Sequence, residues 1–183
     1  HFIVAPHGMR SFFEYMIRQE TENAKKGLPS GITVKVNSLV DPKIIELLYE
    51  ASKAGVRVQL IVRGICCLIP GIEGVSENIT VMSIVGQLLE HSRIFRFENA
   101  GNPRIYMGSA DWMPRNLDRR VELVFPIEDE TQKARAFGIL DTMLSDTTNA
   151  RFMQSDTSYE HVDLRGKKKI SSQLTFYHEA QAR

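Results

Sequence analysis

Regular patterns of apolar and polar residues predict a series of short strands. From residue 32 to residue 37 every second position is apolar, which is the period of a β-strand. Lys35 and Asn37 therefore share one face of that strand, because side chains alternate between the two faces. Residues 56–62 are apolar almost throughout, which is typical of a strand covered on both faces. Further strands are expected over residues 2–5, 79–83, 94–97, 104–107 and 121–125.

Longer stretches carry apolar residues at helical spacing. One covers residues from about 9 to 26, and another covers residues from about 130 to 145. A third begins at Asp41-Pro42, where the aspartate can cap the helix and the proline suits its first turn. A shorter helix is predicted over residues 84–90.

The order of these elements predicts the fold class. The strand, helix and strand between residues 32 and 62 form a right-handed crossover unit, which joins parallel strands. Residues 94–107 predict a hairpin, because the turn-forming segment 99–102 separates two strands. We therefore expect an α/β domain with a mixed, mostly parallel sheet flanked by helices. It extends over residues 1–183, and from about residue 147 it continues as a polar C-terminal extension.

Composition and charge narrow the function classes. Apolar residues make up 43% of the 183 residues and charged residues 25%, which excludes collagen-like, disordered and disulfide-scaffold proteins. The formal net charge is +1, so any site for a polyanion must come from a local arrangement of charges. The two cysteines are adjacent and no apolar run is long enough to span a membrane. These features predict a cytoplasmic location.

Arg63 occupies a position where α/β proteins bind ligands. It follows directly after the buried strand that ends at Val62. In open α/β sheets, ligands bind beyond the carboxyl ends of the strands. An arginine there can make a two-pronged contact with phosphate oxygens, although a structural ion pair is the alternative.

The densest polar cluster of the sequence lies between residues 89 and 122. His91 and Arg93 stand two residues apart on an extended segment, so both can face one site. Gly108-Ser109 ends the next strand, where a hydroxyl and a free backbone amide can hold an anion. Arg115, Arg119 and Arg120 follow in a loop with two carboxylates. Imidazole beside guanidinium groups suits phosphoryl chemistry, whereas a lone histidine among surface ion pairs is the simpler alternative.

Part of this cluster resembles the HxKx4D…GS motif of the phospholipase D superfamily. His91, Arg93 and Glu98 match the motif's spacing, and Gly108-Ser109 matches its second part. An arginine replaces the motif's lysine, a glutamate replaces its aspartate, and the distance to Gly108-Ser109 is a few residues longer. These departures put a phospholipase-D-type hydrolysis in doubt.

Longer blocks resemble the polyphosphate kinase family of the phospholipase-D-like type. The most similar blocks are residues 29–41, 60–71, 89–93 and 108–116, and the resemblance runs over nearly the whole chain. The chain is similar to the last domain of those enzymes, the second of two phospholipase-D-like halves.

The resemblance implies an activity and a set of site residues. Enzymes of the family reversibly transfer the terminal phosphate of ATP to polyphosphate through a phosphohistidine, which lies in the preceding domain, and they require Mg²⁺. Arg63 and His91 match ATP-site residues of the family, and His91 is the expected catalytic residue. No metal ligand is expected within this chain. Further phosphate contacts are expected from Lys35, Asn37, Arg93, Ser109, Arg115 and Asn116.

The resemblance also implies partners. ATP, ADP and polyphosphate are the expected ligands, and the upstream domains of the same enzyme, in a homo-oligomer, are the expected protein partners. No specific nucleic acid is expected. Association with a membrane through the full-length enzyme is an open alternative to a purely cytoplasmic location. Two alternatives remain: a phosphodiesterase that dimerises to bring two copies of His91 together, or a non-catalytic module that binds polyphosphate or nucleic acid. The basic run of residues 165–169 weakly favours the second alternative.

Overall fold

The predicted strand–helix–strand unit forms the centre of the sheet. In the computed structural model, which describes residues 2–166 and 168–182, β2 (Gly31–Val36) pairs in parallel with β3 (Arg57–Val62). The crossover is α2 (Pro42–Lys53), and the Asp41 side chain caps it by accepting a hydrogen bond from the Ile44 amide at 3.0 Å. The cap and the crossover are as predicted from the sequence.

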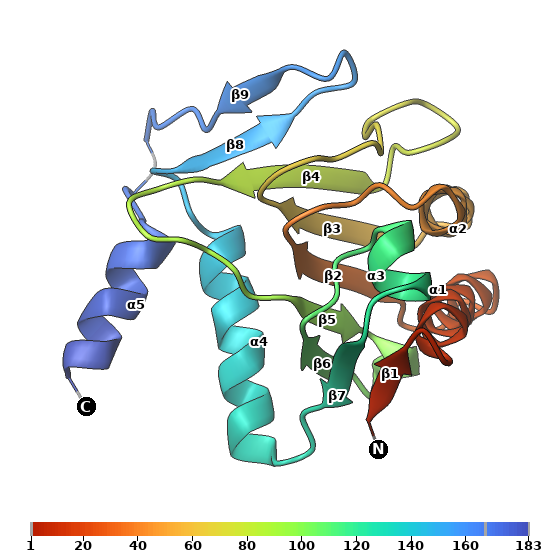
Figure 1. Ribbon diagram of the computed structural model, residues 1–183. Helices are drawn as coiled ribbons and strands as arrows, with labels where there is room; N and C mark the ends of the chain where they lie inside the picture. Colours follow the sequence, from red (N-terminus) through yellow and green to blue (C-terminus); the bar gives the residue numbers. More distant parts are fainter. Residues whose placement is uncertain (1, 167, 183) are drawn as a thin grey trace.

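The described residues form one nine-stranded sheet in the order β1-β7-β6-β5-β2-β3-β4-β8-β9 (Figure 1). The other strands are β1 (Ile3–Ala5), β4 (Ile79–Ile84), β5 (Ile94–Phe97), β6 (Arg104–Gly108), β7 (Glu122–Pro126), β8 (Ala150–Met153) and β9 (Tyr159–His161).

The prediction of a mixed sheet is confirmed, but the predicted majority of parallel strands is wrong. Only the β2–β3 and β3–β4 pairs are parallel among the named strands of the described residues, and the other neighbours are antiparallel. Short connections explain two of these antiparallel pairs, because six residues join β5 to β6 and five join β8 to β9. A short turn can join only antiparallel strands, whereas a parallel pair needs a crossover.

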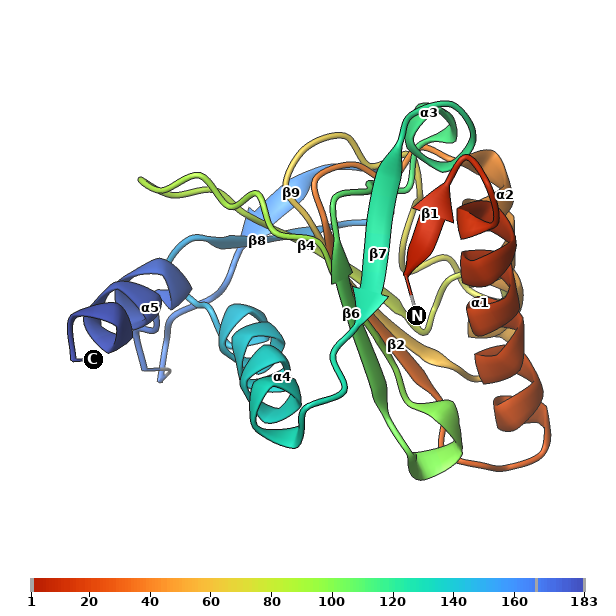
Figure 2. The ribbon, with the colours of Figure 1, turned by 60° about the horizontal axis from the view of Figure 1, so that its bottom comes forward.

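Helices cover both faces of the sheet (Figure 2). On one face, α1 (Met9–Lys25) and α2 pack over the buried residues of β2 and β3. On the other face, α4 (Glu130–Leu144) packs over a second apolar cluster that includes Ile61 and Met82. Both long helices were predicted, and each buries one apolar stripe in the way expected of a helix on a sheet.

The short helix predicted over residues 84–90 is absent, and this segment is irregular beyond the end of β4. The side chain of Gln173 holds it instead: Nε2 donates to the Leu88 carbonyl at 2.7 Å, and Oε1 accepts from the Leu88 amide at 3.0 Å. These bonds come from a residue far along the chain, so local spacing could not reveal them.

The segment beyond residue 147 joins the sheet. There β8 pairs with β4, β9 pairs with β8, and α5 (Ser172–Gln181) follows. Of the predicted basic run, Lys167 lies outside the described residues. None of the helices in the described ranges is long and apolar enough to cross a membrane.

Candidate functional site

A polar cleft lies where β2 and β3 end. Figure 2 shows α3 (Pro114–Asp118) and the loops after β2 and β3 gathered at one end of the sheet. The cleft has a volume of about 570 Å³. Its lining residues are Asn37, Ser38, Arg63, His91, Arg93, Ser109, Asp111, Arg115, Asn116, Arg120 and Glu122. The fold therefore gathers seven of the eight predicted site residues, all except Lys35, in one place.

The cleft is rich in unpaired positive charge. Among the residues that the structure describes, the guanidinium groups of Arg63, Arg115 and Arg120 make no hydrogen bond or ion pair with the protein. Arginine presents a planar set of donors that suits phosphate oxygens. Three such groups around one cleft can therefore bind a polyanionic phosphate chain.

His91 is exposed at the edge of the cleft. Its pKa is lowered mainly by the positive charge of Arg93, with smaller contributions from burial and from Arg63. A lowered pKa leaves the imidazole neutral at pH 7, and a neutral imidazole has one nitrogen that can accept a proton and one that can donate a hydrogen bond.

Arg93 is held in place by a buried ion pair. Its Nη2 donates to Asp111 Oδ2 at 3.0 Å, and its Nη1 donates to the His91 carbonyl at 2.8 Å. The second oxygen of Asp111, Oδ1, accepts a hydrogen bond from the backbone amide of Asn37 at 2.7 Å. Asp111 thus joins the end of β2 to the His91 segment. Arg93 fixes the backbone of His91 and contributes its charge to the cleft.

Asn37 presents an unsatisfied polar group to the cleft. Its side chain is buried, with 5% of the residue exposed, and neither amide atom has a hydrogen-bond partner in the described structure. Leaving a buried amide unpaired costs free energy, so buried polar groups in native proteins almost always have a hydrogen-bond partner. A bound ligand in the cleft can supply it. Asn116 Oδ1 is likewise buried without a partner.

The predicted free amide at Gly108-Ser109 is absent. The Ser109 amide donates to the Leu123 carbonyl at 2.9 Å, and its hydroxyl is hydrogen-bonded to Glu122. Asn116 Nδ2 also donates to Glu122, at 2.7 Å. The hydroxyl gives its one proton to Glu122 and accepts a hydrogen bond from the Leu123 amide at 3.1 Å, so Ser109 has no free donor for a phosphate oxygen. The expectation was wrong because it ignored the pairing of β7 with this strand end.

Lys35 does not line the cleft. It is buried with 1% of the residue exposed, and its ammonium donates to the carbonyls of Glu90 and Ser92 at 3.3 and 3.1 Å. These two residues flank His91, so Lys35 anchors the segment that carries the imidazole. The pKa of Lys35 is lowered to about 8, mainly by burial and also by the nearby Arg63 and Arg93, while Glu90 and Asp111 act in the opposite direction.

This lowered pKa predicts a pH-dependent stability. The folded state disfavours the charged form of Lys35, so stability should rise as the pH increases from the folded pKa of about 8 towards the unfolded pKa. Between about pH 7.5 and about pH 9.5 the parent should gain roughly 2 kcal/mol of unfolding free energy relative to Lys35→Met. Urea titrations of both proteins at each pH measure this difference. Parallel pH profiles would contradict the buried ammonium.

Four cleft residues were not predicted as site residues: Ser38, Asp111, Arg120 and Glu122. Asp111 and Glu122 act through bonds to residues distant in sequence, which spacing does not show. Arg120 lies two residues before the start of β7, and its position near a strand end, beside predicted phosphate contacts, was the available signal. Glu98, which completes the motif's spacing, lies at the other end of β5 and forms an ion pair with Arg96 at 3.4 Å.

The cleft does not form a metal site by itself. Within residues 2–166 and 168–182, no group of three or more His, Cys, Asp or Glu side chains is arranged to hold a metal ion. The cleft carboxylates Asp111 and Glu122 already accept hydrogen bonds from Arg93 and from Ser109 and Asn116. These residues therefore do not fit a magnesium site, and the chemistry of the cleft rests on its own cations, amides and imidazole.

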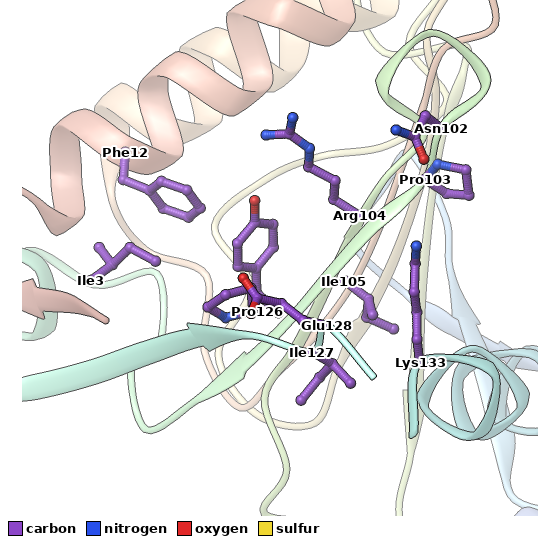
Figure 3. A pocket seen from close by; sticks show the side chains of 11 residues that line it. Ile3, Phe12, Asn102, Pro103, Arg104, Ile105, Pro126, Ile127, Glu128 and Lys133 are labelled. Carbon is purple, nitrogen blue, oxygen red and sulfur yellow. The ribbon is translucent and has the colours of Figure 1, made fainter. Parts of the chain in front are cut away.

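A separate hollow of about 510 Å³ lies at the other ends of β6 and β7 (Figure 3). Phe12 and Ile3 face it from the side of α1 and β1, and Arg104 and Lys133 reach it from β6 and α4. It contains no predicted site residue and no histidine, serine or cysteine. The polar cleft is therefore the better candidate for phosphoryl chemistry.

Comparison with known proteins identifies the family of this chain. The family described as Polyphosphate kinase C-terminal domain 2 matches residues 2–173. The chain is 51% identical over 178 residues to the polyphosphate kinase of Lactiplantibacillus plantarum, covering 97% of this chain and 25% of that protein. It is 44% identical over 177 residues to the polyphosphate kinase of Escherichia coli K12, covering 97% of this chain and 26% of that protein.

Solved structures agree with this assignment. The crystal structure of polyphosphate kinase from Porphyromonas gingivalis superposes with a TM-score of 0.94 at 37% identity, over 99% of this chain and 28% of that chain. The phospholipase D family member Nuc from Salmonella typhimurium has the same fold, with a TM-score of 0.58 at 15% identity over 85% of this chain and 97% of that chain. This confirms the predicted phospholipase-D-like fold.

The chain therefore spans about a quarter of the length of the curated relatives it matches. It matches the family's C-terminal domain over almost its whole length, at identities well above those that show a shared fold alone. This chain belongs to the polyphosphate kinase family.

Proposed function

We propose that this chain is the ATP- and phosphate-binding part of an enzyme that reversibly transfers the terminal phosphate of ATP to polyphosphate. The observation that carries the proposal is the cleft itself, where three unpaired guanidinium groups and the His91 imidazole surround the buried, unpartnered amide of Asn37. Phosphoryl transfer depends on positioning and on stabilising negative charge, which these groups supply.

In this proposal the cleft residues have different roles. Arg63 binds phosphate oxygens through two donors, because its guanidinium is unpaired and lies beyond the end of β3. His91, neutral at pH 7, hydrogen-bonds to the transferring phosphate or moves a proton during transfer. Asn37 and Asn116 complete the contacts with amide groups, and Arg93 and Arg115 add further hydrogen bonds or charge.

The rest of the machinery lies outside this chain. We infer that the phosphohistidine intermediate forms on a preceding domain and that magnesium is held there as well. The length of the relatives supports this division, since this chain covers only about a quarter of them. This domain works together with the upstream domains of the same enzyme, which forms a homo-oligomer in the cytoplasm. Its ligands are ATP, ADP and polyphosphate.

A hydrolytic phosphodiesterase is less well supported. Arg93 stands in the position of the lysine of the phospholipase D motif, and its guanidinium is engaged by Asp111. Three of its five N–H donors are used, two by Asp111 and one by the His91 carbonyl. The similarity to Nuc extends to the fold only, at 15% identity.

The binding role of Arg63 is directly testable. Arg63→Ala should weaken ATP binding by about 1.5–3 kcal/mol, because it removes a charged hydrogen-bond donor from the phosphates. Titration calorimetry with ATP on the full-length enzyme measures the change. Arg135→Ala removes an equal charge from exposed α4, which does not line the cleft, and serves as the control. Unchanged affinity in Arg63→Ala would refute the assignment.

A further inference from the structure

A second hollow adjoins the cleft at Arg63. It has a volume of about 360 Å³ and lies between the end of β4, the loop after β3 and the strands β8 and β9. Arg63 lines both the hollow and the cleft. The two spaces therefore share the residue to which the phosphate-binding role has been given, and Arg63 borders a ligand in either of them.

The sheet places a second arginine in this hollow. Ser83 of β4 and Arg151 of β8 are directly opposite each other in the antiparallel register, so their side chains lie on the same face of the sheet. The Ser83 hydroxyl donates to the Arg63 carbonyl at 3.2 Å. This hydrogen bond ties the end of β3 to β4, and it fixes the backbone of Arg63 beside the strand position from which Arg151 projects.

The hollow is suited to an anion. No carboxylate lines it, and within the described ranges neither Arg63 nor Arg151 has a hydrogen bond or ion pair through its guanidinium. Ser83, Asn149 and Tyr159 add polar groups around the two cations. Two unpaired guanidinium groups with no counter-charge repel each other, and a bound anion removes that repulsion.

We propose that this hollow is a second phosphate subsite, in which Arg151 binds a phosphate group further along the chain that Arg63 holds. The proposal rests on the proposed function, and it extends the phosphate path from the cleft across β4 to β8. Polyphosphate carries a negative charge on every repeat, so it can contact successive arginines in neighbouring hollows. ATP carries phosphates only at one end, so polyphosphate is the ligand that best fits both spaces.

Steady-state kinetics of the full-length enzyme in the direction of ATP formation test the subsite. Arg151→Gln should raise the KM for long-chain polyphosphate about three- to tenfold, as expected for loss of one partly exposed charged contact. In the synthetic direction the KM for ATP should stay within about twofold of the parent. Arg151→Lys keeps the charge and should recover part of the loss. Arg135→Gln, which removes a charge from α4, should leave both constants unchanged.

The outcomes separate the subsite from the proposed function. A higher KM for polyphosphate alone supports the subsite with polyphosphate as its ligand, whereas an equal rise for ATP supports a phosphate subsite occupied by the nucleotide. If Arg151→Gln changes neither constant while Arg63→Ala still weakens ATP binding, the subsite is refuted and the proposed function stands. If Arg63→Ala also has no effect, the proposed function itself fails. Equal melting temperatures of the variants exclude a general loss of folding.

Discussion

Replacing His91 by alanine in the full-length enzyme should reduce polyphosphate synthesis by about 10²–10⁴-fold, the range for loss of a residue that moves a proton or polarises the reacting group. The melting temperature should remain close to that of the parent, because the imidazole is exposed at the edge of the cleft. The backbone of His91 stays in place through Arg93 and Lys35, which bond to carbonyls of residues 90–92 and need no imidazole.

A matched histidine distinguishes this effect from a general one. His178 is exposed on α5, outside the cleft, so His178→Ala should retain full synthesis. Rates of polyphosphate formation from ATP, measured at saturating ATP, compare the two variants. Normal synthesis by His91→Ala with an unchanged melting temperature would show that the imidazole has no part in the reaction.

The pH dependence of the parent provides an independent check of the same residue. Arg93 lowers the pKa of His91, so the imidazole stays neutral to a lower pH than a free histidine. If the neutral form is required, the acid limb of the rate profile should lie below the usual histidine pKa of about 6.5. His91→Ala should lose that limb. An acid limb unchanged in the variant would assign the titration to another group.

Residues that act at the end of a strand could be predicted from the sequence. Arg63 was identified because it follows a buried strand, and Asp41 because aspartate before proline marks a helix start. Both signals are local, since strand ends and helix caps are determined by a few neighbouring residues. Strand alternation placed Asn37 on one face of the predicted strand over residues 32–37, and the structure places it directly after the end of β2.

Residues whose roles depend on tertiary contacts could not be predicted in this way. Lys35 was expected in the cleft, but a buried ammonium can reach any nearby carbonyl, and the carbonyls of Glu90 and Ser92 are brought to it only when β5 pairs with β2. The Ser109 amide was expected to be free, but pairing with β7 uses it. In each case the competing partner lies more than ten residues away in the sequence.

The resemblance to the phospholipase D motif identified one site residue that local patterns did not require, and it also pointed to one residue outside the site. It placed His91 in a site, which spacing alone did not require, and the fold brings His91 to the same cleft as Arg63. It also drew attention to Glu98, which lies at the opposite end of β5 from His91. Matching a spacing therefore identifies strand positions, whereas the contacts of each position depend on which strands become neighbours.

Gly108→Ala should be the most destabilising single-methyl change in this part of the fold. A Cβ at Gly108 would lie 2.2 Å from the Leu123 carbonyl oxygen and 2.9 Å from Val124 Cα. Both are backbone atoms of β7, so no side chain can move aside. We expect a loss of about 2–4 kcal/mol of unfolding free energy, because relieving the clash must separate β6 from β7.

A second glycine gives the opposite expectation and serves as the control. Gly138 lies within α4, and a Cβ there would meet no atom within 4 Å. Gly138→Ala should therefore stabilise the protein by about 0.5–1 kcal/mol, through the better helix propensity of alanine. Urea unfolding of both variants measures the two changes.

The separation of β6 from β7 has a consequence for the cleft. Ser109 follows directly after β6 and Glu122 begins β7, and the hydrogen bonds of Glu122 to Ser109 and Asn116 cross between them. Gly108→Ala should therefore also weaken ATP binding at temperatures where the protein remains folded. A variant as stable as the parent, with unchanged ATP affinity, would show that β7 can shift without disturbing the cleft, and the tight contact at Gly108 would then have no role in positioning it.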